Sequence, residues 1–182
     1  MKKVLRYLLM TVMALCFSLP CMSAEAASVA LLPLINNVQG DEVANQVFYQ
    51  NAIATMNKTK GFVMVENDKL TAAIEAANVG KEVPGAAAMA KIAKDGKVDM
   101  VIAIQVDAIN DIPVPSSEEN KLKLDIQGYA ASYNALTGAY KKDRIYNDSV
   151  IPEVFSSRWD VAHEEFGREV RKAITKALKA KK

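Results

Sequence analysis

Cysteine is scarce in this sequence of 182 residues, and the two that occur lie close to its start. They are Cys16 and Cys21, and both fall within a segment that we expect to be removed on export. A chain without them has no disulfide, no thiol nucleophile and no cysteine ligand for a metal. We therefore expect the remaining chain to be stabilised by its hydrophobic core alone.

Residues 1–26 show the pattern of a signal peptide. Basic residues between positions 2 and 6 precede the uncharged apolar run of residues 8–19. That run is shorter than the roughly 20 residues that a membrane-spanning helix needs, and the small residues Ala24 and Ala26 fit a cleavage site. We predict cleavage after Ala26, which leaves a periplasmic or secreted protein with no transmembrane segment. An uncleaved anchor helix is the alternative.

A lipid anchor is not expected at either cysteine. Bacterial lipoproteins carry a small residue immediately before the modified cysteine, whereas Pro20 precedes Cys21. Cys16 lies inside the apolar run and fits no better. We predict that both cysteines leave with the signal peptide.

An excess of charge of one sign is also missing. The formal net charge is +2, and residues 1–26 account for it because they hold three basic groups and one acidic group. The near-neutral remainder has no electrostatic footprint for nucleic acid. Residues 27–182 are long enough to bury a core, and we expect them to form a single domain.

Catalytic and cofactor motifs are missing as well. His163 is the only histidine, and the second histidine of an H-E-x-x-H zinc motif does not follow it. The sequence contains no G-x-S-x-G nucleophile turn and no glycine-rich phosphate loop. We therefore expect no cofactor and no enzyme activity, and we interpret His163 as a partly exposed helix residue.

Short apolar runs alternate with helical patterns after residue 26. The runs that indicate buried strands are residues 28–35, 62–66 and 98–106. The helical patterns that follow them are residues 41–59, 68–78 and 85–96. This alternation predicts parallel strands joined by right-handed crossovers. Pro33 cannot donate to a ladder, so we expect the pairing of the first strand to end or bulge there.

The second half of the sequence has a different pattern. Residues 122–134 alternate between apolar and polar side chains, and a turn at Thr137 and Gly138 leads to a more polar strand over residues 139–150. This pattern predicts an antiparallel meander with one solvated face. Residues 157–179 form the clearest helix. Its apolar stripe is Trp159, Ala162, Phe166, Val170, Ala173, Ile174 and Ala177.

These elements predict an α/β (α+β) fold. The expected order is β-α-β-α-α-β-β-β-α, with a mixed sheet of about five strands. We expect the helices to pack on the faces of the sheet, and the last helix to close the core.

Four segments resemble the CsgG/LpoB-like envelope domains, which share the fold of the TolB amino-terminal domain. They are SVALLPLINN (28–37), GFVMVE with Leu70 (61–70), AKIAKDGKVDMVI (90–102) and LTG (136–138). The resemblance implies a non-enzymatic module that assists envelope assembly by protein contact. It also leaves open a ring-forming structural component, and hence a homo-oligomer.

The meander supplies the candidate binding residues. If the tyrosines share the solvated face with the lysines, they form a platform for an envelope protein or cell-wall component. The candidates are Lys121, Lys123, Tyr129, Tyr133 and Tyr140. The alternative is that the last helix covers some of these tyrosines.

Asp107 and Asp111, after the strand of residues 98–106, are the only paired acids that merit testing as a site. Strand ends of open α/β sheets often meet ligands, so these acids are weak candidates for a metal or sugar site. They are also the only candidates for a cell-wall hydrolase, which needs two carboxyls across one cleft. We favour a simple turn, because Asp and Asn are common turn residues.

Overall fold

The computed structural model describes residues 26–66, 68, 70–114, 121–152 and 158–179, with the side chains of 158–160 excluded. Both cysteines therefore lie outside the described residues, as does the proposed signal peptide apart from Ala26. The strands are β1 (Ala27–Leu31), β2 (Ile35–Asn36), β3 (Phe62–Val65), β4 (Met100–Val114), β5 (Lys121–Asn134) and β6 (Ala139–Pro152). The helices are α2 (Val43–Lys58), α3 (Thr71–Ala76), α4 (Ala86–Asp95) and α5 (Arg158–Lys179).

The strands form one mixed sheet in the order β3-β1-β4-β5-β6, with β2 paired to β4. β1 is parallel to β3 and β4, whereas β4, β5 and β6 are antiparallel neighbours. The predicted mixed sheet with packed helices is confirmed. The sheet has six strands because the predicted first strand divides around Pro33 into β1 and β2. This division is expected, because proline has no N–H to donate to a neighbouring strand.

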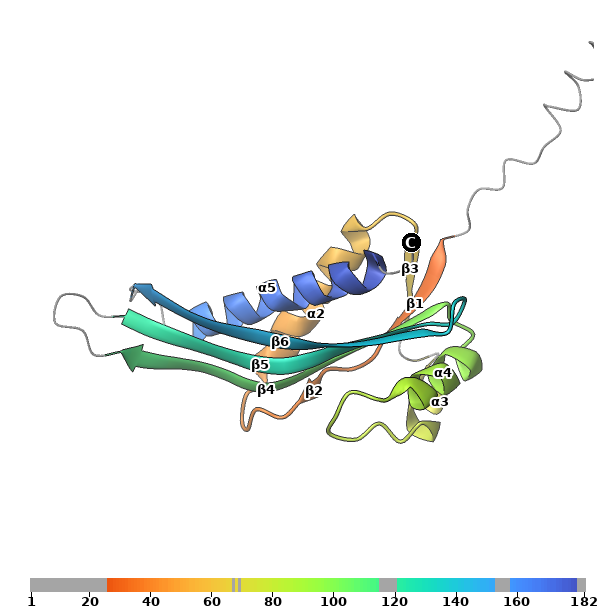
Figure 1. Cartoon of the computed structure of the whole chain (residues 1–182), viewed down its shortest axis with the longest axis horizontal. Helices are drawn as coiled ribbons and strands as arrows, with labels where there is room; N and C mark the ends of the chain where they lie inside the picture. Colours follow the sequence, from red (N-terminus) through yellow and green to blue (C-terminus); the bar gives the residue numbers. More distant parts are fainter. Residues whose placement is uncertain (1–25, 67, 69, 115–120, 153–157, 180–182) are drawn as a thin grey trace, which may run out of the picture.

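Helices cover both faces of this sheet. In Figure 1, α2 and α5 lie on one face and α3 and α4 on the other. The core under α2 and α5 contains Phe48, Ile104, Ile126 and Phe166, all fully buried. The core under α3 and α4 is smaller and contains Leu70, Met89, Ile92 and Val101. The predicted stripe of α5 is buried from Ala162 onward, except that Ala173 is only partly buried, and the side chain of Trp159 lies outside the described residues.

A β-bulge divides β4 into two parts. The register with β5 shifts between Val106 and Ala108, so Asp107 is the extra residue. Gly128 lies opposite the shift, where a Cβ atom would collide with the main-chain oxygen of Gln105. The bulge therefore requires a residue without a side chain at position 128.

A buried acid–histidine pair joins α2 to α5. His163 is only 4% exposed, and its Nε2 lies 2.9 Å and 3.0 Å from the two carboxyl oxygens of Asp41. Asp41 Oδ1 also accepts the N–H of Ala44 at 3.0 Å, so it caps the first turn of α2. The prediction of a partly exposed His163 is wrong, because the second turn of α5 packs against the start of α2.

Replacing His163 by alanine should lower the free energy of unfolding by about 2–3 kcal/mol, because Asp41 would stay buried without this partner. Chemical denaturation would measure the change. The Asp41→Ala/His163→Ala double variant should lose less than the sum of the two single losses. Glu164→Ala, at the exposed neighbouring position, should change the value by less than about 0.5 kcal/mol. Additive losses would contradict the pairing.

Replacing Gly128 by alanine should destabilise the protein by about 1–3 kcal/mol or more, because the colliding atom belongs to the backbone and cannot rotate away. Thermal unfolding would measure the effect. Gly80→Ala is the control, because nothing lies within 4 Å of its Cβ position and its φ is not positive. Equal melting temperatures for the two variants would show that the bulge tolerates a side chain.

Candidate protein-binding face

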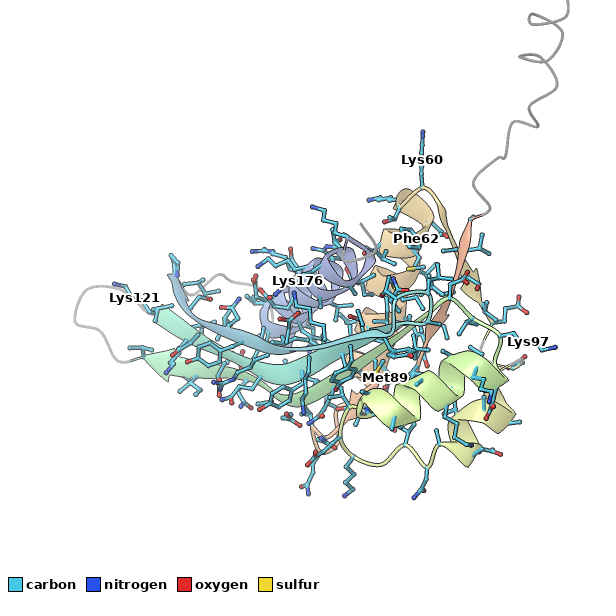
Figure 2. All side chains as sticks on the ribbon, turned by 45° about the vertical axis from the view of Figure 1, so that its right-hand side comes forward. Lys60, Phe62, Met89, Lys97, Lys121 and Lys176 are labelled. Carbon is cyan, nitrogen blue, oxygen red and sulfur yellow. The ribbon has the colours of Figure 1, made fainter. Side chains whose placement is uncertain are left out.

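Beyond α4, one face of the β4–β6 meander has no described helix over it (Figure 1). We call this surface the open face. It comprises Ile112, Lys121, Lys123, Asp125, Gln127, Tyr129, Arg144, Tyr146, Asp148 and Val150, which the strand registers place on one side. In Figure 2, Lys121 lies at the end of the sheet distant from α4, and Met89 lies between α4 and the sheet.

A charged cluster occupies the centre of the open face. Lys123 Nζ lies 3.1 Å from Asp148 Oδ1, and the Tyr146 hydroxyl donates to Asp148 Oδ2 at 3.0 Å. These hydrogen bonds, first from Lys123 and then from Tyr146, lower the pKa of Asp148. The hydrogen bond with Asp148 raises the pKa of Lys123 and the pKa of Tyr146. The three side chains therefore hold one another in place on the strand surface.

Cations also lie over the aromatic rings of this region. Lys142 Nζ is 4.5 Å from the ring centre of Tyr129, and the Arg144 guanidinium carbon is 4.6 Å from that of Tyr146. Both distances are within the range of cation–π attraction. The rings are thus fixed in orientation before any partner binds.

Apolar side chains are exposed beside this cluster. Ile112 is 46% exposed, Val150 is 55% exposed and Tyr146 is 50% exposed. Ile112 and Val150 both pair across the strands with Lys123, so the three side chains form one row. The open face therefore combines apolar, aromatic and charged groups over adjacent strands.

The five predicted contact residues do not stay together. Lys121 and Lys123 lie on the open face, whereas Tyr129, Tyr133 and Tyr140 are all partly buried against the core under α4, with Tyr129 at the border of the open face. The hydroxyl of Tyr140 donates to the carbonyl oxygen of Pro84 at 3.2 Å, and burial raises its pKa. In the alternative that we considered, the last helix covers some of these tyrosines. In the structure they pack under α4 and not under α5. These tyrosines share the face of Tyr129, which points away from α5.

The two predicted acids do not form a pair. Asp107 and Asp111 lie within β4 and not in a turn, because the strand continues to Val114. Asp107 accepts a hydrogen bond from Gln105, on the α4 side, while Asp111 pairs with Leu124, which lies in the core under α5. The two carboxyls are therefore on opposite faces of the sheet and cannot act across one cleft. Among the described residues, no group of three or more acids or histidines could hold a metal.

The predicted strand of residues 98–106 ends too early, because β4 continues through Pro113 to Val114. Beyond Val106, β4 pairs with β5 and with no other described strand. Proline is tolerated in a strand with a free edge, because its missing N–H can face that edge. The residues that reasoning missed are Arg144, Tyr146, Asp148 and Val150 of β6. Their period-two alternation was the signal that could have placed them beside Lys123.

No protein-family model matches the chain, and no curated protein matches its sequence. Solved structures do resemble it. The hypothetical protein CT253 from Chlamydia trachomatis has a TM-score of 0.56 at 9% identity, over 85% of this chain and 98% of that chain. This likeness shows that the two chains share a fold.

Two lipoprotein-related structures are also similar. Lipoprotein GNA1162 from Neisseria meningitidis has a TM-score of 0.43 at 13% identity, over 82% of this chain and 99% of that chain. The C-terminal domain of LpoB from Salmonella enterica has a TM-score of 0.38 at 12% identity, over 69% of this chain and 84% of that chain. The expected likeness to CsgG and TolB stays a prediction. In the part of the chain that the structure describes, no helix has the length and apolar character to cross a membrane.

Replacing Lys123 by methionine should raise the pKa of Asp148 toward its ordinary value of 3.8, because the hydrogen bond with Lys123 is the largest cause of the lowering. The stabilisation by this pair is present above pH 3.8 and is lost as the pH falls through the folded-state pKa. NMR titration of the carboxyl carbon would measure the shift. Lys142→Met, which removes the cation over Tyr129, is the control and should leave Asp148 unchanged. An unaltered Asp148 titration in Lys123→Met would refute the pairing.

Proposed function

We propose that this protein is an exported, non-catalytic binding module that assists cell-envelope assembly by protein contact through its open face. The observation that supports this function is the row of exposed Ile112 and Val150 beside the Tyr146–Asp148–Lys123 cluster. Tyrosine, arginine and apolar side chains together are typical of the residues that dominate protein interfaces.

The charges of this surface indicate the kind of partner. The open face has three basic side chains, Lys121, Lys123 and Arg144, against the acids Asp125 and Asp148. Lys142, over the ring of Tyr129, adds a further positive charge beside it. The excess is positive, so it favours a protein whose contact surface is apolar at the centre and acidic at its rim.

The support beneath the open face also suits binding. Its side chains stand on paired strands, which hold contact residues more firmly than loops do. The opposite face of the same strands is anchored by Leu124, Ile126 and Ile145 in the core under α5. Little ordering of the backbone is then required when a partner binds, so the entropic cost of binding is lower.

The signal-peptide pattern of residues 1–26 supports an extracytoplasmic site of action. Within a single domain of residues 27–182, the open face would then meet partners outside the cytoplasm. The hydrolase alternative has no support, because Asp107 and Asp111 lie on opposite faces of the sheet.

Site-specific photo-crosslinking in intact cells would test this function. A photoreactive residue at position 150 should capture one defined envelope protein, whereas one at position 168, on the exposed side of α5, should not. Adding Arg144→Ala and Tyr146→Ala should reduce the crosslinking yield at position 150 at least tenfold, because one cationic and one aromatic contact are lost.

Tyr140→Phe is the matched control, because it keeps the ring and removes only the bond to Pro84. It should leave the crosslink intact. Equal yields from positions 150 and 168, or full yield from the double variant, would exclude the open face as the contact surface. Circular dichroism would establish that the variants are folded.

A further inference from the structure

A polar hollow lies beside β2, which pairs in parallel with β4 just before the β-bulge. β1 is parallel to its neighbours β3 and β4. The chain passes from β1 to β3 through α2 on one face, and from β3 to β4 through α3 and α4 on the other face (Figure 1). β2 ends at Asn36 in the wall of the hollow, and the carboxyl ends of strands in α/β sheets often meet ligands.

The hollow has a volume of about 660 Å³, within the range of small-molecule sites. Its walls are the segment after β1, the loop before α4 and one side of β4. Most of the lining side chains are polar: Asn36, Asn37, Gln39, Lys81, Glu82, Gln105 and Asp107, with Ile35, Val38 and Gly80.

Hydrogen bonds fix the polar groups before any ligand binds. Asp107 Oδ1 accepts from Asn37 Nδ2 at 2.8 Å and from Gln105 Nε2 at 2.6 Å. Gln105 is only 5% exposed, and its Oε1 accepts the N–H of Val83 at 2.9 Å. Asn37 Nδ2 also donates to the carbonyl oxygen of Lys81 at 3.0 Å, which ties the two loops together. A buried amide therefore holds Asp107 in one orientation at the edge of the hollow.

The β-bulge explains why the acid points here. A bulge re-aims the side chain of the extra residue, and bulges are common beside binding sites. Asp107 is the extra residue of β4, and it shares the α4 side of the sheet with Gln105. The bulge that requires glycine at position 128 is therefore the same bulge that places Asp107 beside Asn37.

The chemistry of the lining limits the class of ligand. One cation, Lys81, faces two carboxylates, Glu82 and Asp107, so the net charge disfavours phosphates and other anions. An apolar ligand would remove water from the carboxylates of Glu82 and Asp107 without replacing it. Metals prefer more carboxylate ligands than the described residues bring together here. A neutral molecule with many hydroxyl groups can both donate to the carboxylates and accept from the side chains of Lys81 and Gln39.

We propose that this hollow binds a short, neutral saccharide. The site is separate from the open face, so it goes beyond the protein contact proposed above. It is nevertheless adjacent, because Gln105 pairs across the strands with Tyr129. A longer saccharide can therefore extend from the hollow toward the aromatic ring of Tyr129.

NMR titration of the isotope-labelled protein with the β-1,4-linked trimer of N-acetylglucosamine would test the site. The main-chain amide signals of Asn37, Lys81 and Asp107 should shift, with a dissociation constant on the order of 1 mM or below. Inorganic phosphate should not shift them. Asp107→Ala should weaken binding at least tenfold, while Asp111→Ala, on the opposite face of the same strand, should not.

Gln39→Ala keeps the test valid if Asp107→Ala unfolds, because Gln39 is exposed at the rim and takes no part in the bonds around Asp107. It should weaken binding several-fold. The Arg144→Ala/Tyr146→Ala variant should bind the trimer normally, which separates this site from the open face. Shifts produced by phosphate instead, equal losses in Asp107→Ala and Asp111→Ala, or no shift at about 10 mM trimer would overturn the proposal.

Discussion

The burial of β4 on both faces is the constraint on which the rest of the structure depends. Every side chain from Met100 to Val106 is buried, so each face of the strand needs its own cover. Even positions such as Ile104 face α2 and α5, and odd positions such as Val101 face α3 and α4. Period-two alternation in one strand therefore divides the helices between two layers.

Unequal lengths of strands and helices then create the open face. α5 has 22 residues and spans about 33 Å, whereas α4 has 10 residues and spans about 15 Å. β5 has 14 residues and extends about 46 Å. A helix as short as α4 cannot cover such a strand, so the remainder stays accessible. Side chains there are in contact with water, which accounts for the mixture of Lys123, Asp125 and Tyr146 with a few apolar groups.

Local patterns predicted the elements of this fold but not the pairs that form between them. The stripe of α5 and the alternation of β5 are visible within a few turns or residues of sequence. The contact of Asp41 with His163 spans 122 positions, and no local pattern reports it. Alternation also separated the two faces of β5, but it could not assign a helix to each face. The packing of Tyr133 and Tyr140 under α4 could therefore not be predicted. The continuation of β4 past the bulge at Asp107 was not predicted either.

The candidate protein contact and the candidate saccharide site lie on the same side of the sheet, and this follows from the same constraint. Among the described residues, most of the face under α2 and α5 packs into the larger core. On the other face, α4 covers only the start of the strands, and the bulge directs Asp107 into the space between the loops. A partner on Tyr129 and a ligand beside Gln105 would then be neighbours on adjacent strands. Binding at one site can therefore influence the other through direct contact, with no change in the fold.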